Sequence, residues 1–139
     1  MPPDIAELWQ FLPWGFLLTI VLETPVLLLG LSQRHSWQRR LFAGVWLTAC
    51  TYPIVVVLLP LTVWHYWGET AYLVVAETFA PIAECLIFVW AFAPQAKEID
   101  GVQEKVGWQS TLQDCAAIVA ANLFSFLFGG FLIEQMKLF

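Results

Sequence analysis

Apolar residues run along this chain in four long stretches that are separated by short polar segments. The segments between them read SQRHSWQRR, HYWGET and QAKEIDGVQEKVGWQS, and the apolar stretches cover residues 11–32, 41–64, 72–94 and 111–133. A helix needs roughly 20 mostly apolar residues to cross a bilayer. The pattern therefore predicts an all-α polytopic membrane protein: one domain over residues 1–139, with four transmembrane helices packed as two hairpins.

The basic residues predict how these helices are oriented. The first polar segment contains Arg34, Arg39 and Arg40, and the third contains Lys97 and Lys105. The N-terminal segment and the second polar segment contain no Lys or Arg, and the C-terminal tail has a single lysine. Because Lys and Arg collect in cytoplasmic loops, we expect the first and third segments to be cytoplasmic and both termini to lie on the other side.

Composition agrees with a membrane location. Apolar residues make up 60% of the chain and charged residues 12%, about half of the usual charged share in soluble domains. The lipid bilayer is thus the first expected partner, and the bacterial inner membrane is the expected location, with a thylakoid or another internal membrane as the open alternative. The net charge of −5 gives no reason to expect nucleic acid as a partner.

Three acids lie deep inside the predicted spans, away from the helix ends. Glu23 falls at the middle of the first helix and Glu84 at the middle of the third, with Glu77 about two turns nearer the outside. Each charge at that depth costs about 2.5 to 3.5 kcal/mol. Glu77 and Glu84 are seven residues apart, so they share one helix face. We expect these acids to face the inside of the bundle.

The other two helices carry polar groups at the same depth. Thr51 and Tyr52 lie at the middle of the second helix, and Asn122 and Ser125 lie near the middle of the fourth. If the four helices form one bundle, these groups meet the acids in a central polar layer. We therefore take Glu23, Glu77, Glu84, Asn122, Thr51, Tyr52 and Ser125 as a candidate proton or ion site, with no cofactor and no particular metal named by the sequence.

Two further patterns concern packing. Small residues recur every fourth position in the last helix, at Ala117, Ala121, Ser125 and Gly129, and such ladders let helices approach closely. This ladder serves either the internal bundle or a homodimer. Asp114 lies in the first turn of the predicted helix, where the helix dipole favours an acid, so we interpret it as a terminus acid.

A short repeat also links the two predicted hairpins. The first helix contains LETPVLLLGL and the third contains AETFAPIAECL, each with Glu-Thr followed by proline. Both helices enter the membrane from the same side. The match suggests two parallel repeats that are related by an axis along the membrane normal.

These motifs resemble a group of small, uncharacterised bacterial four-helix inner-membrane proteins. The resemblance rests on Glu23 before Pro25, on Thr51 before Pro53, on the two acids of the third helix and on Asn-x-x-Ser in the fourth. The second motif of that group is usually Thr-His-Pro, whereas this chain has Tyr52 at the histidine position. The resemblance implies the architecture and carries no activity.

The sequence leaves two functions open. Two carboxylates about 4 Å apart repel by about 4 kcal/mol at an effective dielectric constant of about 20, so Glu23 and Glu84 would have to share a proton or a cation. This favours a small, oligomeric transporter or channel, in which Glu23, Glu77 and Glu84 bind and relay protons or a cation. The alternative is an accessory or assembly subunit of a larger membrane complex, in which protonated acids fix the helix contacts. No catalytic motif is found, so we do not expect an enzyme.

Overall fold

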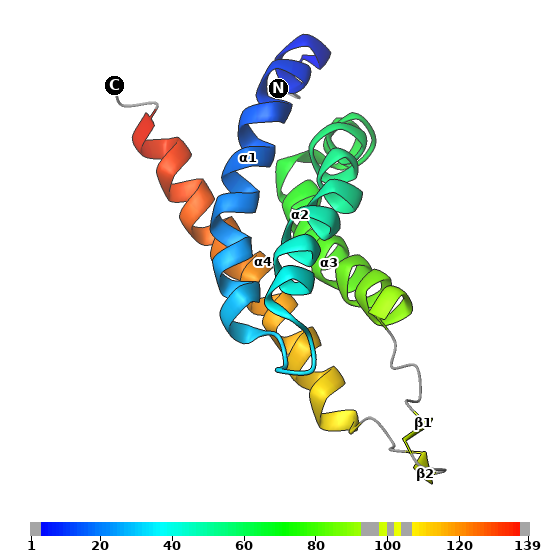
Figure 1. Cartoon of the computed structure of the whole chain (residues 1–139). Helices are drawn as coiled ribbons and strands as arrows, with labels where there is room; N and C mark the ends of the chain where they lie inside the picture. The colour runs from blue at the N-terminus through cyan, green and yellow to red at the C-terminus, as the bar shows by residue number, and fades with distance from the viewer. Residues whose placement is uncertain (1–3, 93–97, 100–101, 104–106, 137–139) are drawn as a thin grey trace.

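Long helices make up nearly all of the computed structural model, which describes residues 4–92, 98–99, 102–103 and 107–136 (Figure 1). The helical elements are α1 (Ile5–Gly30), α2 (Trp37–Pro53), η1 (Ile54–Leu58), η2 (Pro60–Trp64), α3 (His65–Phe92) and α4 (Trp108–Met136). Two short strands, β1 (Glu98–Ile99) and β2 (Val102–Gln103), form an antiparallel pair between α3 and α4.

The stretch from Trp37 to Phe92 is one bent helical segment. It reverses direction at Gly68, whose φ of 87° and ψ of 174° lie outside the helical region (Figure 1). Glycine tolerates this positive φ because it has no Cβ. The polar segment HYWGET was predicted as a loop between two helices, but the structure reduces this loop to a break at one glycine.

The part of this segment before the bend includes π-helical turns, in which the N–H of Leu59 donates to the carbonyl of Ile54 and that of His65 to the carbonyl of Pro60. Pro53 and Pro60 stand at the starts of these turns. Proline has no N–H to donate and its ring crowds the carbonyl four residues earlier, so the regular α-helical pattern is broken here.

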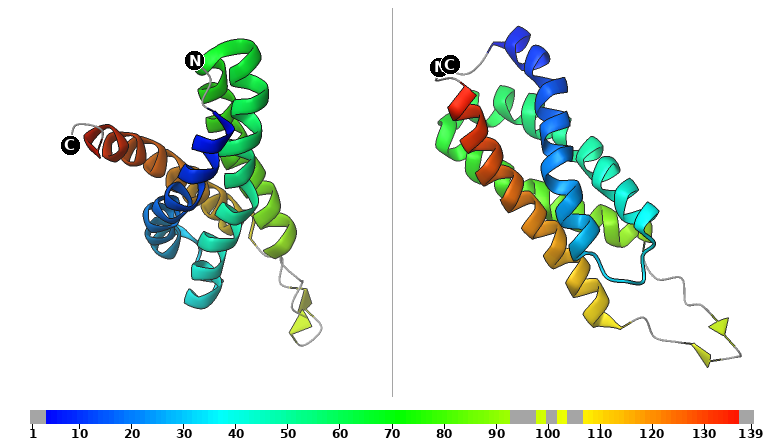
Figure 2. Two further views of the ribbon diagram at one scale, coloured as in Figure 1. Left: turned by 90° about the horizontal axis from the view of Figure 1, so that it is seen from above. Right: turned by 60° about the vertical axis from the view of Figure 1, so that its left-hand side comes forward.

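The helices alternate in direction, so the start of α1 and the end of α4 lie at one end of the bundle (Figure 2). We call this the terminal end, and we call the opposite end, where residues 31–36 connect α1 to α2, the loop end. α1 and α3 each pack against both α2 and α4. The tightest apolar packing joins Leu27, Leu47, Phe88 and Ile118, one residue from each long helix.

Large apolar side chains cover the outside of the helices. Leu29 is 87% exposed and Trp90 81% exposed, and similar residues lie along every long helix. The segments Ile5–Gly30, Trp37–Phe92 and Trp108–Gln135 are long and apolar enough to cross a membrane. The chain is therefore an integral membrane protein, with lipid in contact with this surface.

The helices extend beyond the predicted spans. α1 begins at Ile5 rather than residue 11, and α4 begins at Trp108 rather than residue 111. Hydropathy marks where the chain leaves hydrocarbon, whereas a helix continues into water as long as its backbone hydrogen bonds are made. The predicted end of the third span, residues 93–94, lies outside the described residues.

Candidate functional site

Glu23 on α1 is buried against α2 and α4, with only 3% of its surface exposed. Its Oε2 accepts a hydrogen bond from the Thr48 hydroxyl at 3.1 Å, and its Oε1 accepts one from the Ser125 hydroxyl at 2.6 Å. The first donor comes from α2 and the second from α4. One carboxyl group thus ties three helices together.

Glu84 on α3 has the same kind of environment and is 2% exposed. Its Oε1 accepts from the Thr51 hydroxyl at 2.6 Å, and its Oε2 accepts from the Asn122 amide at 2.8 Å. Again one donor comes from α2 and the other from α4. The Asn122 amide also donates to the carbonyl of Ile118 at 3.0 Å, which fixes its orientation.

These contacts define a carboxyl layer across the bundle: Glu23, Thr48, Thr51, Glu84, Asn122 and Ser125. The donors on α2 are three residues apart, as are the donors on α4, so each pair lies on adjacent positions of one helix face. One donor of each pair turns to α1 and the other to α3. Of the seven residues predicted for the site, five belong to this layer.

A cavity of about 270 Å³ lies against this layer. At about 30 Å³ per molecule this volume has room for about nine waters. Its lining residues run along α1 from Glu23 back to Phe11 and along α4 from Asn122 to Ile133, that is, from the layer toward the terminal end. The carboxyl layer thus forms the inner wall of a cavity that extends toward the terminal end of the bundle.

Tyr52 and Glu77, the two remaining predicted residues, line the cavity rather than bond to the layer. Tyr52 is buried and packs against Phe16, with ring centroids 5.7 Å apart. Its hydroxyl lies so close to Gly15 that a Cβ there would clash. Glu77 is half-buried on the α3 wall. Because it lies seven residues before Glu84 on α3, it is the acid nearest the terminal end among Glu23, Glu77 and Glu84.

Sequence reasoning missed Thr48. It lies one turn before Thr51 on the same face of α2, and this spacing was the available signal. Its hydroxyl also donates to the carbonyl of Gly44 at 2.8 Å, the common local bond of a helical threonine. Nothing in the sequence separates a threonine that bonds only its own helix from one that also reaches an acid.

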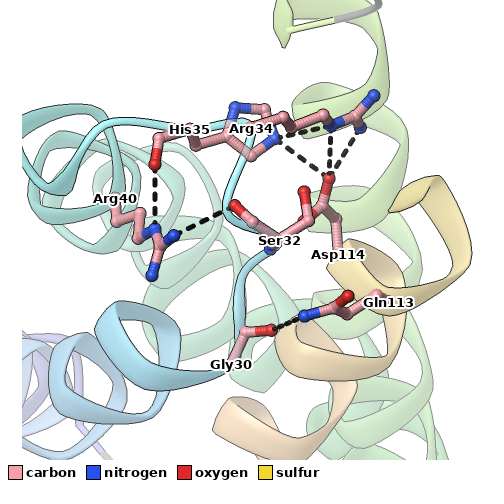
Figure 3. Close-up of polar contacts among 7 residues, drawn as sticks. All are labelled: Gly30, Ser32, Arg34, His35, Arg40, Gln113 and Asp114. Carbon is pink, nitrogen blue, oxygen red and sulfur yellow. Dashed lines mark hydrogen bonds and ion pairs between the residues drawn. The ribbon is translucent and has the colours of Figure 1, made fainter. Parts of the chain in front are cut away.

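Asp114 is not the terminus acid that the sequence suggested, because it is 0% exposed and lies in the second turn of α4. Its Oδ2 accepts from Arg34 Nη2 at 2.6 Å and lies 2.9 Å from His35 Nε2 (Figure 3). Its Oδ1 accepts from the backbone N–H of Ser32 at 2.7 Å. Asp114 thus anchors the α1–α2 connection to α4.

Arg40 binds backbone carbonyl groups at the loop end. Its guanidinium donates to the carbonyls of Ser32 and His35 at 3.2 and 3.1 Å (Figure 3). It also donates to the carbonyl of Leu28 at 2.9 Å, which satisfies a group in the last turn of α1. The His35 ring packs edge-on against Phe88, with centroids 5.2 Å apart. Charged and aromatic groups together close the loop end.

The small-residue ladder of α4 faces α1 inside the same chain. Ala117 and Ala121 are buried in the apolar core, and a Cβ added to Gly30 would lie 2.9 Å from the Cβ of Ala117. Gly129 is buried opposite Leu22. Ser125, between them, bonds Glu23. The ladder therefore lets α4 approach α1 closely enough for that bond.

Within the described residues, no three or more His, Cys, Asp or Glu side chains come together in a way that could hold a metal ion. Comparisons of the chain with protein-family models, with curated proteins and with solved structures find no match. The carboxyl layer and its cavity are therefore the features of the molecule that bear on its function.

Proposed function

We propose that this protein moves protons or a cation across the membrane through the carboxyl layer. The observation that carries the proposal is the position of Glu23 and Glu84: both are buried in one layer, and both line a cavity that leads to the terminal end. Intramembrane carboxyl groups on a cavity wall are typical of ion and proton pathways.

The charges around the layer support the same function. Glu23, Glu77 and Glu84 line the cavity, whereas its lining includes no Lys, Arg or His among the residues that the structure describes. Carboxylates in such a space repel one another unless protons or a cation neutralise them. The cavity therefore has to acquire positive charge, and the species that supplies it is the natural candidate for transport.

We further propose four membrane crossings, with the bend at Gly68 separating the second from the third. Arg34, Arg39 and Arg40 belong to the loop end or to the first turn of α2 next to it. By the positive-inside rule this places the loop end in the cytoplasm and both termini outside, in keeping with a bacterial inner-membrane protein. The cavity then extends toward the non-cytoplasmic side.

The loop end closes the path in this conformation. The apolar cluster of Leu27, Leu47, Phe88 and Ile118 lies there, next to the ion pair between Arg34 and the fully buried Asp114. Transport through the layer therefore requires this end to open, in the manner of a site that is accessible from one side at a time.

The test is flux into liposomes that contain the purified protein, measured with a pH-sensitive dye for protons and with isotopes for monovalent cations. We expect Glu23→Gln and Glu84→Gln to abolish flux. Glu134→Gln is the matched control, because Glu134 is an exposed acid near the end of α4. Flux that survives in both layer variants would contradict the proposal.

One observation favours a second function, that of an accessory subunit in a larger membrane complex. Each layer carboxyl bonds two other helices, which is also what a purely structural acid would do. Isolation from the native membrane in a mild detergent distinguishes the two. A stoichiometric complex with other proteins, lost in Glu84→Gln, would support the accessory function, whereas a free monomer or homo-oligomer with flux would support transport.

A further inference from the structure

Each hydroxyl of the carboxyl layer has two acceptors within reach. Thr48 reaches Glu23 Oε2 at 3.1 Å and the carbonyl of Gly44 at 2.8 Å. Thr51 reaches Glu84 Oε1 at 2.6 Å and the carbonyl of Leu47 at 3.1 Å. A hydroxyl carries one hydrogen, so it can donate to only one of the two at a time.

Ser125 on α4 has the same choice. Its hydroxyl reaches Glu23 Oε1 at 2.6 Å and the carbonyl of Asn122 at 3.0 Å. Three side chains from two helices therefore share one arrangement, with a carboxyl oxygen on one side and a carbonyl of their own helix on the other.

This arrangement satisfies the layer in two protonation states. When a carboxyl is ionised, the neighbouring hydroxyl donates to it. When the carboxyl is protonated, it donates to the hydroxyl oxygen instead, and the hydroxyl hydrogen turns to the helix carbonyl. No heavy atom has to move, and no buried polar group of the pair loses its partner, which would otherwise be costly.

Asn122 lacks this freedom, and that restricts where the proton of Glu84 can sit. Its amide nitrogen donates both to Glu84 Oε2 and to the carbonyl of Ile118, and an amide nitrogen cannot accept. A proton on Oε2 would face a donor. The proton of Glu84 therefore belongs on Oε1, opposite Thr51.

We propose that the carboxyl layer is a proton-binding site in which Thr48, Thr51 and Ser125 act as reversible hydrogen-bond partners, and that Glu84 gains and loses its proton at Oε1, with Thr51 as the hydrogen-bond partner of that oxygen. This deepens the proposed function, on which it rests, by naming the proton as the bound species. The proton is favoured because each hydroxyl has both a carboxyl oxygen and a helix carbonyl within reach, which satisfies the protonated and the ionised carboxyl alike.

The protonation of Glu84 balances in atoms and charge. A hydronium ion in the cavity gives a proton to Glu84 Oε1, so that one O–H bond breaks, one forms and a water molecule remains. The hydroxyl of Thr51 turns at the same time from Glu84 to the carbonyl of Leu47. The other ionisable groups on this cavity are Glu23 on α1, Tyr52 on α2 and Glu77 on α3.

The experiment is infrared difference spectroscopy of the reconstituted protein during a pH titration, which detects the C=O stretch of protonated carboxyl groups, run alongside the proton-flux assay. Wild-type protein should show a titrating carboxyl band that loses a component in Glu84→Gln. Thr51→Val should move that component to the frequency of an acid without an acceptor and slow proton flux about tenfold, the factor expected for one hydrogen bond. Thr51→Ser should restore both.

The matched control is Thr62→Val, because Thr62 is an exposed threonine that bonds only carbonyls of its own helix. It should leave both the band and the flux unchanged. A Thr51→Val protein that matches wild type in both measurements, or a Thr51→Ser protein that behaves like Thr51→Val, would overturn the inference.

The two proposals fail separately. A titrating Glu84 band that responds to Thr51 without any flux keeps the proton site and removes transport. Flux of sodium or potassium without a titrating carboxyl band keeps transport and removes the proton site.

Discussion

The two polar regions of this protein, the carboxyl layer and the loop end, differ in whether their buried acids have a basic partner. The carboxyl layer contains acids without bases, whereas Asp114 at the loop end is paired with Arg34 at 2.6 Å. An ion pair whose acid is fully buried is strongly destabilising to break, because the remaining charge has no partner. The loop-end pair is therefore expected to contribute to stability, whereas for the acids of the layer we propose proton chemistry.

Asp114→Asn tests this difference. The asparagine cannot balance Arg34, but the arginine side chain is 23% exposed and partly solvated, so we expect the free energy of unfolding to fall by about 1 to 3 kcal/mol, as measured by urea unfolding in mixed micelles. A double-mutant cycle with Arg34→Gln should give a coupling free energy above about 1 kcal/mol. The control is Glu134→Gln, at an exposed position. If the Asp114→Asn protein were as stable as this control, the ion pair would contribute nothing to stability.

At the residue scale the sequence located the acids but not all of their partners. Depth along a helix follows from counting residues, which is why Glu23, Glu84 and Asn122 could be assigned to one level. The direction of a side chain around the helix does not follow from depth. For this reason Thr48 was missed and Asp114 was interpreted wrongly, since the contacts of each depend on which neighbouring part of the chain it meets.

Among the helices, the hydrogen bonds of the layer reveal an internal symmetry. Glu23 bonds Thr48 of its own hairpin and Ser125 of the other, and Glu84 bonds Asn122 of its own hairpin and Thr51 of the other. The sequence suggested the repeat through the Glu-Thr motifs, which align Glu23 with Glu77. The contacts instead make Glu84 the counterpart of Glu23.

This symmetry predicts which substitutions Asn122 tolerates. Its counterpart in the first hairpin is Thr48, so Asn122→Thr should keep a donor to Glu84 and stay within about 1 kcal/mol of wild-type stability. Asn122→Val has the same shape as threonine without the hydroxyl and should lose about 1 to 3 kcal/mol. Equal stability of the two variants, measured by the same unfolding assay, would count against the symmetry.

Close contact between α1 and α2 holds the layer in register. A Cβ on Gly44 would lie 2.6 Å from Thr24 Oγ1 and 3.2 Å from Thr24 Cα, so the two helices would have to move apart. We expect Gly44→Ala to cost about 1 to 3 kcal/mol of stability. Gly130→Ala is the control, because a Cβ there meets nothing within 4 Å. If Gly44→Ala were as stable as Gly130→Ala, the contact between α1 and α2 at this position would not be tight.

For the whole molecule, hydropathy predicted the all-helical architecture and the membrane location, because both depend on the sum of many apolar residues. It did not predict the continuity of the segment from Trp37 to Phe92. Helical geometry persists through His65, Tyr66 and Trp67 despite their polarity, and the chain turns only where Gly68 permits a positive φ. A polar segment marks a membrane exit but does not specify how the backbone makes the turn.

The closed loop end and the open terminal end predict one-sided access to the bundle interior. In a variant whose three cysteines are replaced by serine, Ala80→Cys on the cavity wall should react with a membrane-impermeant thiol reagent added on the terminal side. Ala43→Cys, at a fully buried position in the apolar core, should stay unmodified from either side. Mass spectrometry of liposomes with known protein orientation reads out both. Rapid labelling of Ala43→Cys from the loop side would place the opening at the wrong end, and the layer would then have to be reached through the Arg34–Asp114 pair rather than through the cavity.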